Sequence, residues 1–176
     1  MIAICCAPRC GGSLLMQTLS LLGIPMAAPA FIPEHDNIRE FNPNGFYEFN
    51  DMEGIKSDVY KGMAVKLYGK QLFDTPKHLI DKLINIDRRK KDAVESYDRV
   101  RQKLPYCEHT SELIYDKNKE LIHKSIDENT LILKLEWCQQ YPSLFVLQLC
   151  TYLEINPTDE QFNNAVKNVT PCRLAH

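Results

Sequence analysis

The chain has 176 residues, of which 44% are hydrophobic and 25% charged, values that are ordinary for a single globular domain over residues 1–176. Its net charge of −2 provides no general attraction to nucleic acid or to an anionic membrane, so an anion site must be built from a few placed donors. The seven cysteines include no C-x-x-C pair, which favours reduced thiols and argues against a disulfide framework or a zinc site.

The first 30 residues are apolar and end in small residues, as a signal peptide does. They carry no basic segment at their start, however, and Pro8 and Arg9 interrupt the apolar run. No stretch of the sequence reaches the ~20 apolar residues that are needed to cross a bilayer. We therefore expect a cytoplasmic protein with neither nucleic acid nor membrane as a partner.

The chain opens with a predicted strand, a glycine-containing turn and a helix. Residues 2–6 (IAICC) form an apolar run without alternation, which is typical of a strand buried on both faces. Residues 7–12 (APRCGG) are rich in residues that break regular structure. A helical pattern then begins at Ser13 and ends at Gly23. This order is typical of the start of a nucleotide-binding α/β domain.

Strands and helices alternate through the rest of the sequence, after a long loop over residues 29–50 that is rich in proline and aromatic residues. The expected elements are a short helix over 51–60, strands over 63–68, 82–86 and 131–135, and helices over 89–104, 111–126, 143–153 and 158–169. Such alternation predicts a mainly parallel sheet covered by helices on both sides. We expect a three-layer α/β/α fold of the P-loop nucleotide-binding type.

The turn before the first helix has the composition of an anion site. Backbone N–H groups at a helix N-terminus point at one spot, and the helix dipole adds about half a positive charge there. Gly11 and Gly12 allow close approach, Ser13 adds a hydroxyl and Arg9 adds a full charge. The loop lacks the lysine of a Walker A motif, which argues against ordinary ATP or GTP hydrolysis. The alternative is a tight turn that binds no ligand.

The same loop resembles one known family. Residues 7–14 (APRCGGSL) look like the 5′-phosphosulfate loop of the sulfotransferases, P-[KR]-S-G-T-[ST]-[WL]. Residues 42–48 (NPNGFYE) look like the N-P-x-G-[YF]-Y-E stretch of a bacterial branch, and residues 61–66 (KGMAVK) like its G-K-A-V-K strand. Residues 131–137 and 152–155 resemble the tail of the family in the same order. The late R-K-G segment of larger members has no clear counterpart.

The resemblance implies a co-substrate, 3′-phosphoadenosine 5′-phosphosulfate (PAPS), and no metal. Its 5′ end would lie on the loop, whose residues are Arg9, Cys10, Gly11, Gly12, Ser13 and Leu14. Cys10 and Gly12 stand where the family usually has hydroxyl side chains, so backbone N–H groups and Ser13 must supply those hydrogen bonds. A cysteine in such a loop is also a candidate for a lowered pKa and a reactive thiol.

A second anion site is expected about 80 residues further along the chain. Members of the family bind the 3′-phosphate of PAPS through an arginine that follows a strand and a serine eight residues after that arginine. Arg88 and Ser96 have this spacing. Ligands of open α/β sheets bind at the ends of the strands, and arginine binds phosphate through charge-assisted hydrogen bonds. Arg89, Lys90 and Lys91 are expected to add local charge. The alternative is a solvated basic start of a helix.

Four residues are candidates for the chemistry. Arg9 and Lys66 are expected to neutralise the transferred group and the leaving phosphate. His35, which has a suitable ordinary pKa, and Glu48, which lies in the family motif, are candidates for the base that takes the acceptor proton. Lys66, His35 and Glu48 could each instead be a solvent-facing or loop-stabilising residue.

The sequence thus favours a PAPS-dependent sulfotransferase that acts on a hydroxyl or amine of a small molecule or glycan and releases adenosine 3′,5′-bisphosphate. One alternative is a nucleotide or small-molecule kinase with a variant loop, which would require magnesium. The other is a non-catalytic relative that keeps the nucleotide-binding fold. The oligomeric state stays open.

Overall fold

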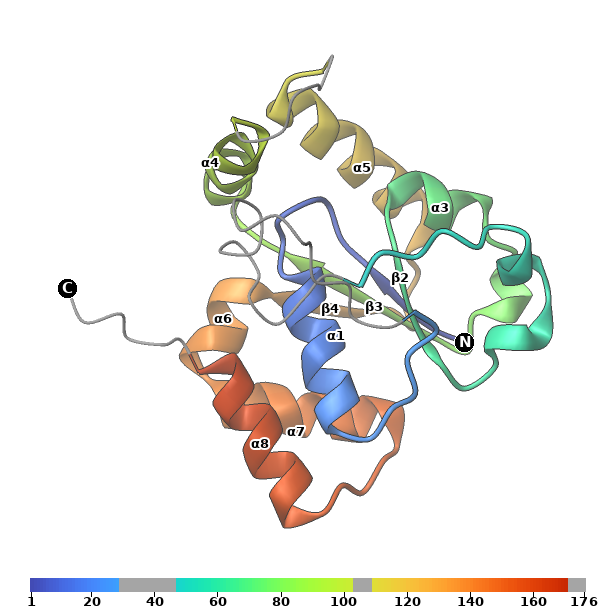
Figure 1. Cartoon of the computed structure of the whole chain (residues 1–176), viewed down its shortest axis with the longest axis vertical. Helices are drawn as coiled ribbons and strands as arrows, with labels where there is room; N and C mark the ends of the chain where they lie inside the picture. The colour runs from blue at the N-terminus through green and yellow to red at the C-terminus, as the bar shows by residue number, and fades with distance from the viewer. Residues whose placement is uncertain (29–46, 103–108, 171–176) are drawn as a thin grey trace.

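The computed structural model describes residues 1–28, 47–102 and 109–170 (Figure 1). Within these ranges the chain forms a four-stranded sheet, in which all neighbouring strands are parallel and the order is β2-β1-β3-β4. The strands are β1 (Ile2–Cys5), β2 (Ala64–Leu67), β3 (Lys82–Asp87) and β4 (Leu131–Lys134). The prediction of an α/β fold with a parallel sheet is confirmed.

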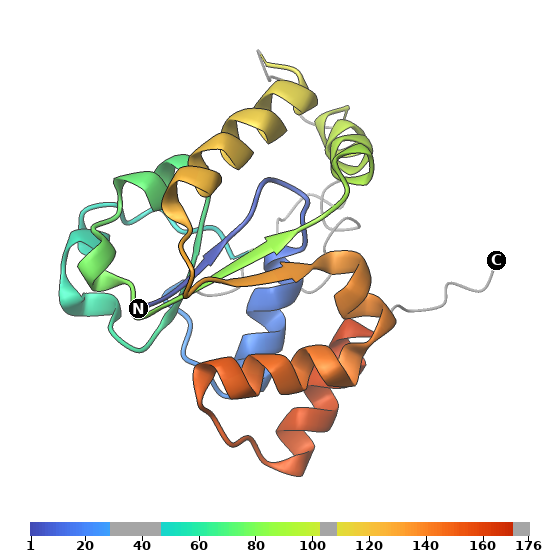
Figure 2. The same cartoon turned by 180° about the vertical axis from the view of Figure 1, so that it is seen from behind.

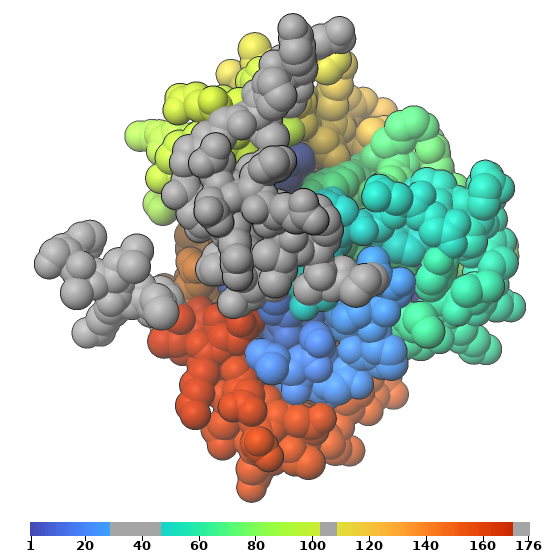
Figure 3. Space-filling view, viewed as in Figure 1, coloured from blue at the N-terminus to red at the C-terminus, as the bar shows by residue number. Residues whose placement is uncertain are grey.

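Helices lie on both faces of this sheet. They are α1 (Gly12–Leu21), α3 (Gly69–Asp74), α4 (Lys90–Arg101), α5 (Ser111–Ser125), α6 (Leu135–Gln140), α7 (Pro142–Leu153) and α8 (Asp159–Val169). Figures 1 and 2 show α1, α7 and α8 on one side of the sheet and α3 and α5 on the other. In the space-filling view α1, in blue, lies directly beside α8, in red, as their packing requires (Figure 3).

The two layers of helices explain why β1 is an uninterrupted apolar run. Ile4 faces the cluster that includes Leu15 of α1 and Phe145 of α7, and all three side chains are fully buried. Ala3 and Cys5 face the opposite cluster, which contains residues of α3 and α5. Because both sides of the strand are covered, no position of β1 has to be polar.

The boundaries of the longer helices follow local signals. Thr110 caps α5 by accepting a hydrogen bond from the N–H of Leu113, and Thr158 caps α8 in a reciprocal pair with Gln161. Pro142 occupies the first turn of α7, where its missing N–H costs nothing. No helix in the described ranges is both long enough and apolar enough to span a membrane.

Some expected elements differ from the observed ones. The helix predicted over 51–60 is two short 3-10 turns, Gly54–Lys56 and Asp58–Tyr60. The six-residue helices α3 and α6 and a further 3-10 turn at Lys77–Leu79 were not predicted. The predicted loop over 29–50 lies outside the described residues except for its last four positions.

Candidate anion-binding site at the carboxyl ends of the strands

Parallel pairing brings the segments that follow β1, β2 and β3 to one edge of the sheet. Cys5, the last residue of β1, lies opposite Leu67 of β2 and Asn85 of β3. The glycine-containing loop follows β1, which is the strand between β2 and β3. At this edge of the sheet the loop therefore has Tyr68, which follows β2, on one side and Asp87, the last residue of β3, on the other. This is the edge at which open α/β sheets bind their ligands.

The loop enters α1 through a glycine that no other residue could easily replace. Gly11 has a left-handed φ of 98°, and a Cβ at this position would lie 2.9 Å from Leu135 Cδ1. As the N-cap of α1, Gly11 has no side chain to bond the first N–H groups, and the first turn holds no acidic residue. The N-terminus of α1 thus keeps the donors and the positive dipole end that an anion needs.

Arg9 connects this loop to α4. Its backbone is also left-handed, with a φ of 65°, a conformation that non-glycine residues rarely adopt. Arg9 Nε donates a hydrogen bond of 3.1 Å to Ser96 Oγ, and Arg88 Nη1 donates one of 3.3 Å to the carbonyl oxygen of Arg9. The structure therefore brings together Arg9, Arg88 and Ser96, three residues that the sequence singled out separately.

The electrostatics of this group are those of a cationic site. The pKa of Arg9 is lowered because the side chain is largely buried, because the positive charge of Arg88 lies close by and, to a smaller extent, because of Arg99. Among the described residues Arg88 makes no ion pair with a carboxylate, and its guanidinium donates to a backbone oxygen. Two guanidinium groups that lie this close together raise the local positive potential and so favour the binding of an anion.

Lys66 joins the loop to the candidate base. The lysine is 4% exposed, and its Nζ lies 2.8 Å from Glu48 Oε1 and 3.4 Å from Ser13 Oγ. Tyr68 donates a second hydrogen bond, of 3.1 Å, to the same oxygen of Glu48. Lys66 is thus no solvent-facing strand end; it points into the site. His35, the other candidate base, lies outside the described residues.

Two loop residues turn away from the anion site. Cys10 is fully buried in the core, and burial raises its pKa to about 12, so the prediction of a reactive thiol with a lowered pKa is wrong. Leu14 is half-buried against the same core. The family resemblance placed both in the cofactor loop, but in this arrangement Cys10 has only its backbone to offer a ligand.

The structure also accounts for the absence of a side chain at position 12. A Cβ on Gly12 would lie 2.5 Å from Cys6 Sγ and 3.3 Å from the Cδ atom of Lys66. Cys6 is 2% exposed and cannot easily move. The thiol of Cys6 therefore fills the space that a hydroxyl residue at position 12 would need.

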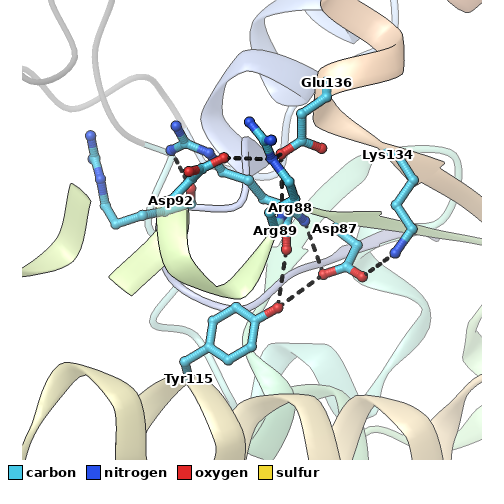
Figure 4. Close-up of polar contacts among 8 residues, drawn as sticks. Asp87, Arg88, Arg89, Asp92, Tyr115, Lys134 and Glu136 are labelled. Atoms are coloured by element: carbon cyan, nitrogen blue, oxygen red, sulfur yellow. Dashed lines mark hydrogen bonds and ion pairs between the residues drawn. The ribbon is translucent and has the colours of Figure 1, made fainter. Parts of the chain in front are cut away.

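Sequence reasoning did not single out Asp87, which ends β3 and is 7% exposed. Its carboxylate lies 3.0 Å from Lys119 Nζ and 2.6 Å from Lys134 Nζ. Tyr115 donates to Asp87 and to the carbonyl oxygen of Arg88, and Figure 4 shows Tyr115 and Lys134 on either side of Asp87. Burial opposes ionisation of Asp87, but the two lysines outweigh it and lower the pKa. An acidic residue that ends an apolar strand was the available signal.

The basic residues after Arg88 do not belong to the site. Arg89 Nε pairs with Asp92 at 2.8 Å and with Glu136 at 3.5 Å, as Figure 4 shows. Lys90 pairs with two acidic residues of α5, and Lys91 lies 3.9 Å from Glu95. Each of these three residues thus has a carboxylate within 4 Å, which argues against the expectation that they add charge for a ligand.

Among the described residues no group of three or more histidine, cysteine or acidic side chains is arranged to hold a metal ion. No protein-family model matches the chain, and no curated protein is significantly similar to it. The functional assignment therefore depends on the sequence motifs and on the geometry of this site.

Proposed function

We propose that this protein transfers the sulfuryl group of PAPS to a hydroxyl or amine of a small molecule or glycan. The observation that carries the proposal is the hydrogen-bonded group of Arg9, Arg88 and Ser96 beside the N-terminus of α1. The 5′-phosphosulfate would lie on the α1 terminus and the 3′-phosphate on Arg88 and Ser96, and Arg9 contacts both of these last two residues.

The reaction would be an in-line displacement. The oxygen or nitrogen of the acceptor attacks sulfur, the bond from sulfur to the bridging oxygen of the 5′-phosphate breaks, and adenosine 3′,5′-bisphosphate leaves. Arg9 would offset the charge that develops on the leaving phosphate, and Lys66 the charge on the transferred group. The proton of the acceptor passes to Glu48, whose Oε1 is fixed by Lys66 and Tyr68.

Two carboxylates within the described ranges, those of Asp87 and Glu48, favour this chemistry over a magnesium-dependent kinase. Asp87 lies at the end of the strand beside β1, but two ammonium groups already neutralise it. Glu48 is likewise paired with Lys66. A magnesium site needs carboxylate oxygens available to the ion, whereas sulfuryl transfer can use placed lysine and arginine side chains.

Thermal unfolding with adenosine 3′,5′-bisphosphate tests the proposal, with ATP and magnesium as the control. A ligand at 100 times its dissociation constant stabilises by about 2.7 kcal/mol, which for a chain of this size raises the midpoint by about 5–11 °C. A shift with the bisphosphate alone supports the proposal. A shift with ATP and magnesium alone points to a kinase, and no shift with either ligand contradicts nucleotide binding.

An Arg9→Ala variant separates an enzyme from a non-catalytic relative. If the protein is an enzyme, this change should reduce sulfuryl transfer from labelled PAPS by roughly 100-fold or more, as for the loss of a donor at the developing charge. A relative without activity shows no transfer with either variant, even when the bisphosphate binds.

A further inference from the structure

The basic residues of α4 divide into two groups. Lys90, Lys91 and Arg101 each lie within 4 Å of a carboxylate, at distances of 2.8, 3.9 and 3.8 Å. Arg99 makes no such contact with any described residue, although acidic residues precede it on the same helix. Arg99 is also exposed, so its charge is available to a ligand.

The position of Arg99 relates it to the anion site. Ser96 and Arg99 are three residues apart on α4, and side chains at this spacing are neighbours on one face of a helix. Helical side chains lean toward the N-terminus, so Arg99 leans toward the turn that holds Ser96. Ser96 Oγ in turn accepts the hydrogen bond from Arg9 Nε.

A second observation agrees with this placement. The positive charge of Arg99 contributes to the lowered pKa of Arg9, after burial and Arg88. The positive charges of Arg88 and Arg99 therefore both act on the guanidinium group of Arg9. Like charges at close range oppose one another, and a ligand phosphate that contacts several of them would remove that repulsion.

We infer that Arg99 is a further ligand-binding residue, and that together with Arg88 and Ser96 it binds a phosphate group distinct from the one held by the α1 loop. This inference rests on the proposed function, because it assigns Arg99 to the 3′-phosphate of the nucleotide. The phosphate site would then combine Arg88, which directly follows β3, with Ser96 and Arg99 of α4.

Calorimetric titration of the full chain tests the inference with two nucleotides that differ only in the 3′-phosphate, adenosine 3′,5′-bisphosphate and adenosine 5′-monophosphate. Loss of a charge-assisted contact should weaken the bisphosphate roughly 10- to 100-fold in Arg99→Ala. The affinity for the monophosphate should stay within about twofold. Arg99→Lys, which keeps the charge but not the forked donors, should give an intermediate loss.

Lys91→Ala is the matched control, because it removes one positive charge from the same helix at a side chain that is 83% exposed. It should leave both affinities unchanged. The inference is overturned if Arg99→Ala binds the bisphosphate as the wild type does, if both nucleotides weaken equally, or if Lys91→Ala has the same effect. Failure of the wild type to bind the bisphosphate overturns the proposed function as well, whereas binding without sulfuryl transfer contradicts only the catalytic proposal.

Discussion

The contact between Gly12 and Cys6 makes a quantitative prediction about the loop. In a Gly12→Ala variant the new Cβ would lie 2.5 Å from Cys6 Sγ, about 0.9 Å closer than the 3.4 Å at which ordinary contact begins. Overpacking of this kind costs about 1–3 kcal/mol, against a gain of about 0.5–1 kcal/mol for alanine over glycine within a helix. We expect a net loss of about 1–2 kcal/mol, which lowers the unfolding midpoint by about 2–8 °C.

A double-mutant cycle identifies the cause of that loss. In a Cys6→Ala background the sulfur atom is gone, so Gly12→Ala should cost little and could stabilise through helix propensity. Thermal unfolding of the four proteins, each at the same concentration and pH, gives the coupling between the two positions. If Gly12→Ala lowers the midpoint by the same amount in both backgrounds, the thiol is not what excludes a side chain from position 12.

Two further predictions concern the charged groups of the site. Glu48→Gln should reduce sulfuryl transfer roughly 100-fold or more through loss of the base, and unchanged transfer would exclude Glu48 from that role. The same variant should lower the free energy of unfolding by about 1–3 kcal/mol, because buried Lys66 loses its counter-charge. Since the folded pKa of Asp87 lies below its ordinary value, its stabilising effect is complete above about pH 4 and is lost as pH falls through the lower folded pKa. Urea unfolding between acid and neutral pH should therefore show the wild type and Asp87→Asn converging in acid, and a constant difference would contradict this.

The strands were the most predictable part of the fold. The strands predicted over 2–6, 63–68, 82–86 and 131–135 match β1 to β4 within one or two residues. β1, β2 and β3 are almost wholly buried and so carry a nearly continuous signal, whereas β4 is partly exposed. The two six-residue helices, α3 and α6, have too few turns to show a period. Their positions depend on packing, which the local sequence does not encode.

Within the site, spacing was more informative than residue type. The eight-residue interval singled out Arg88 and Ser96, and in the structure both contact Arg9. Nothing local indicates these contacts, since Arg9 precedes Arg88 by 79 residues. The partners of Arg89 and Lys90 were missed for the same reason. The carboxylates of α5 and α6 that neutralise Arg89 and Lys90 are distant in sequence and adjacent only in the folded chain.

The buried thiols of Cys6 and Cys10 make it possible to measure how often the loop between β1 and α1 opens. Burial raises the pKa of Cys6 to about 11 and that of Cys10 to about 12, so at neutral pH fewer than about one in a thousand of either thiol is ionised. An alkylating reagent can then modify them only during excursions that expose the loop to water. The labelling rate, measured by mass spectrometry, would report the frequency of these openings. A nucleotide that holds the loop against α1 and α4 would lower that rate.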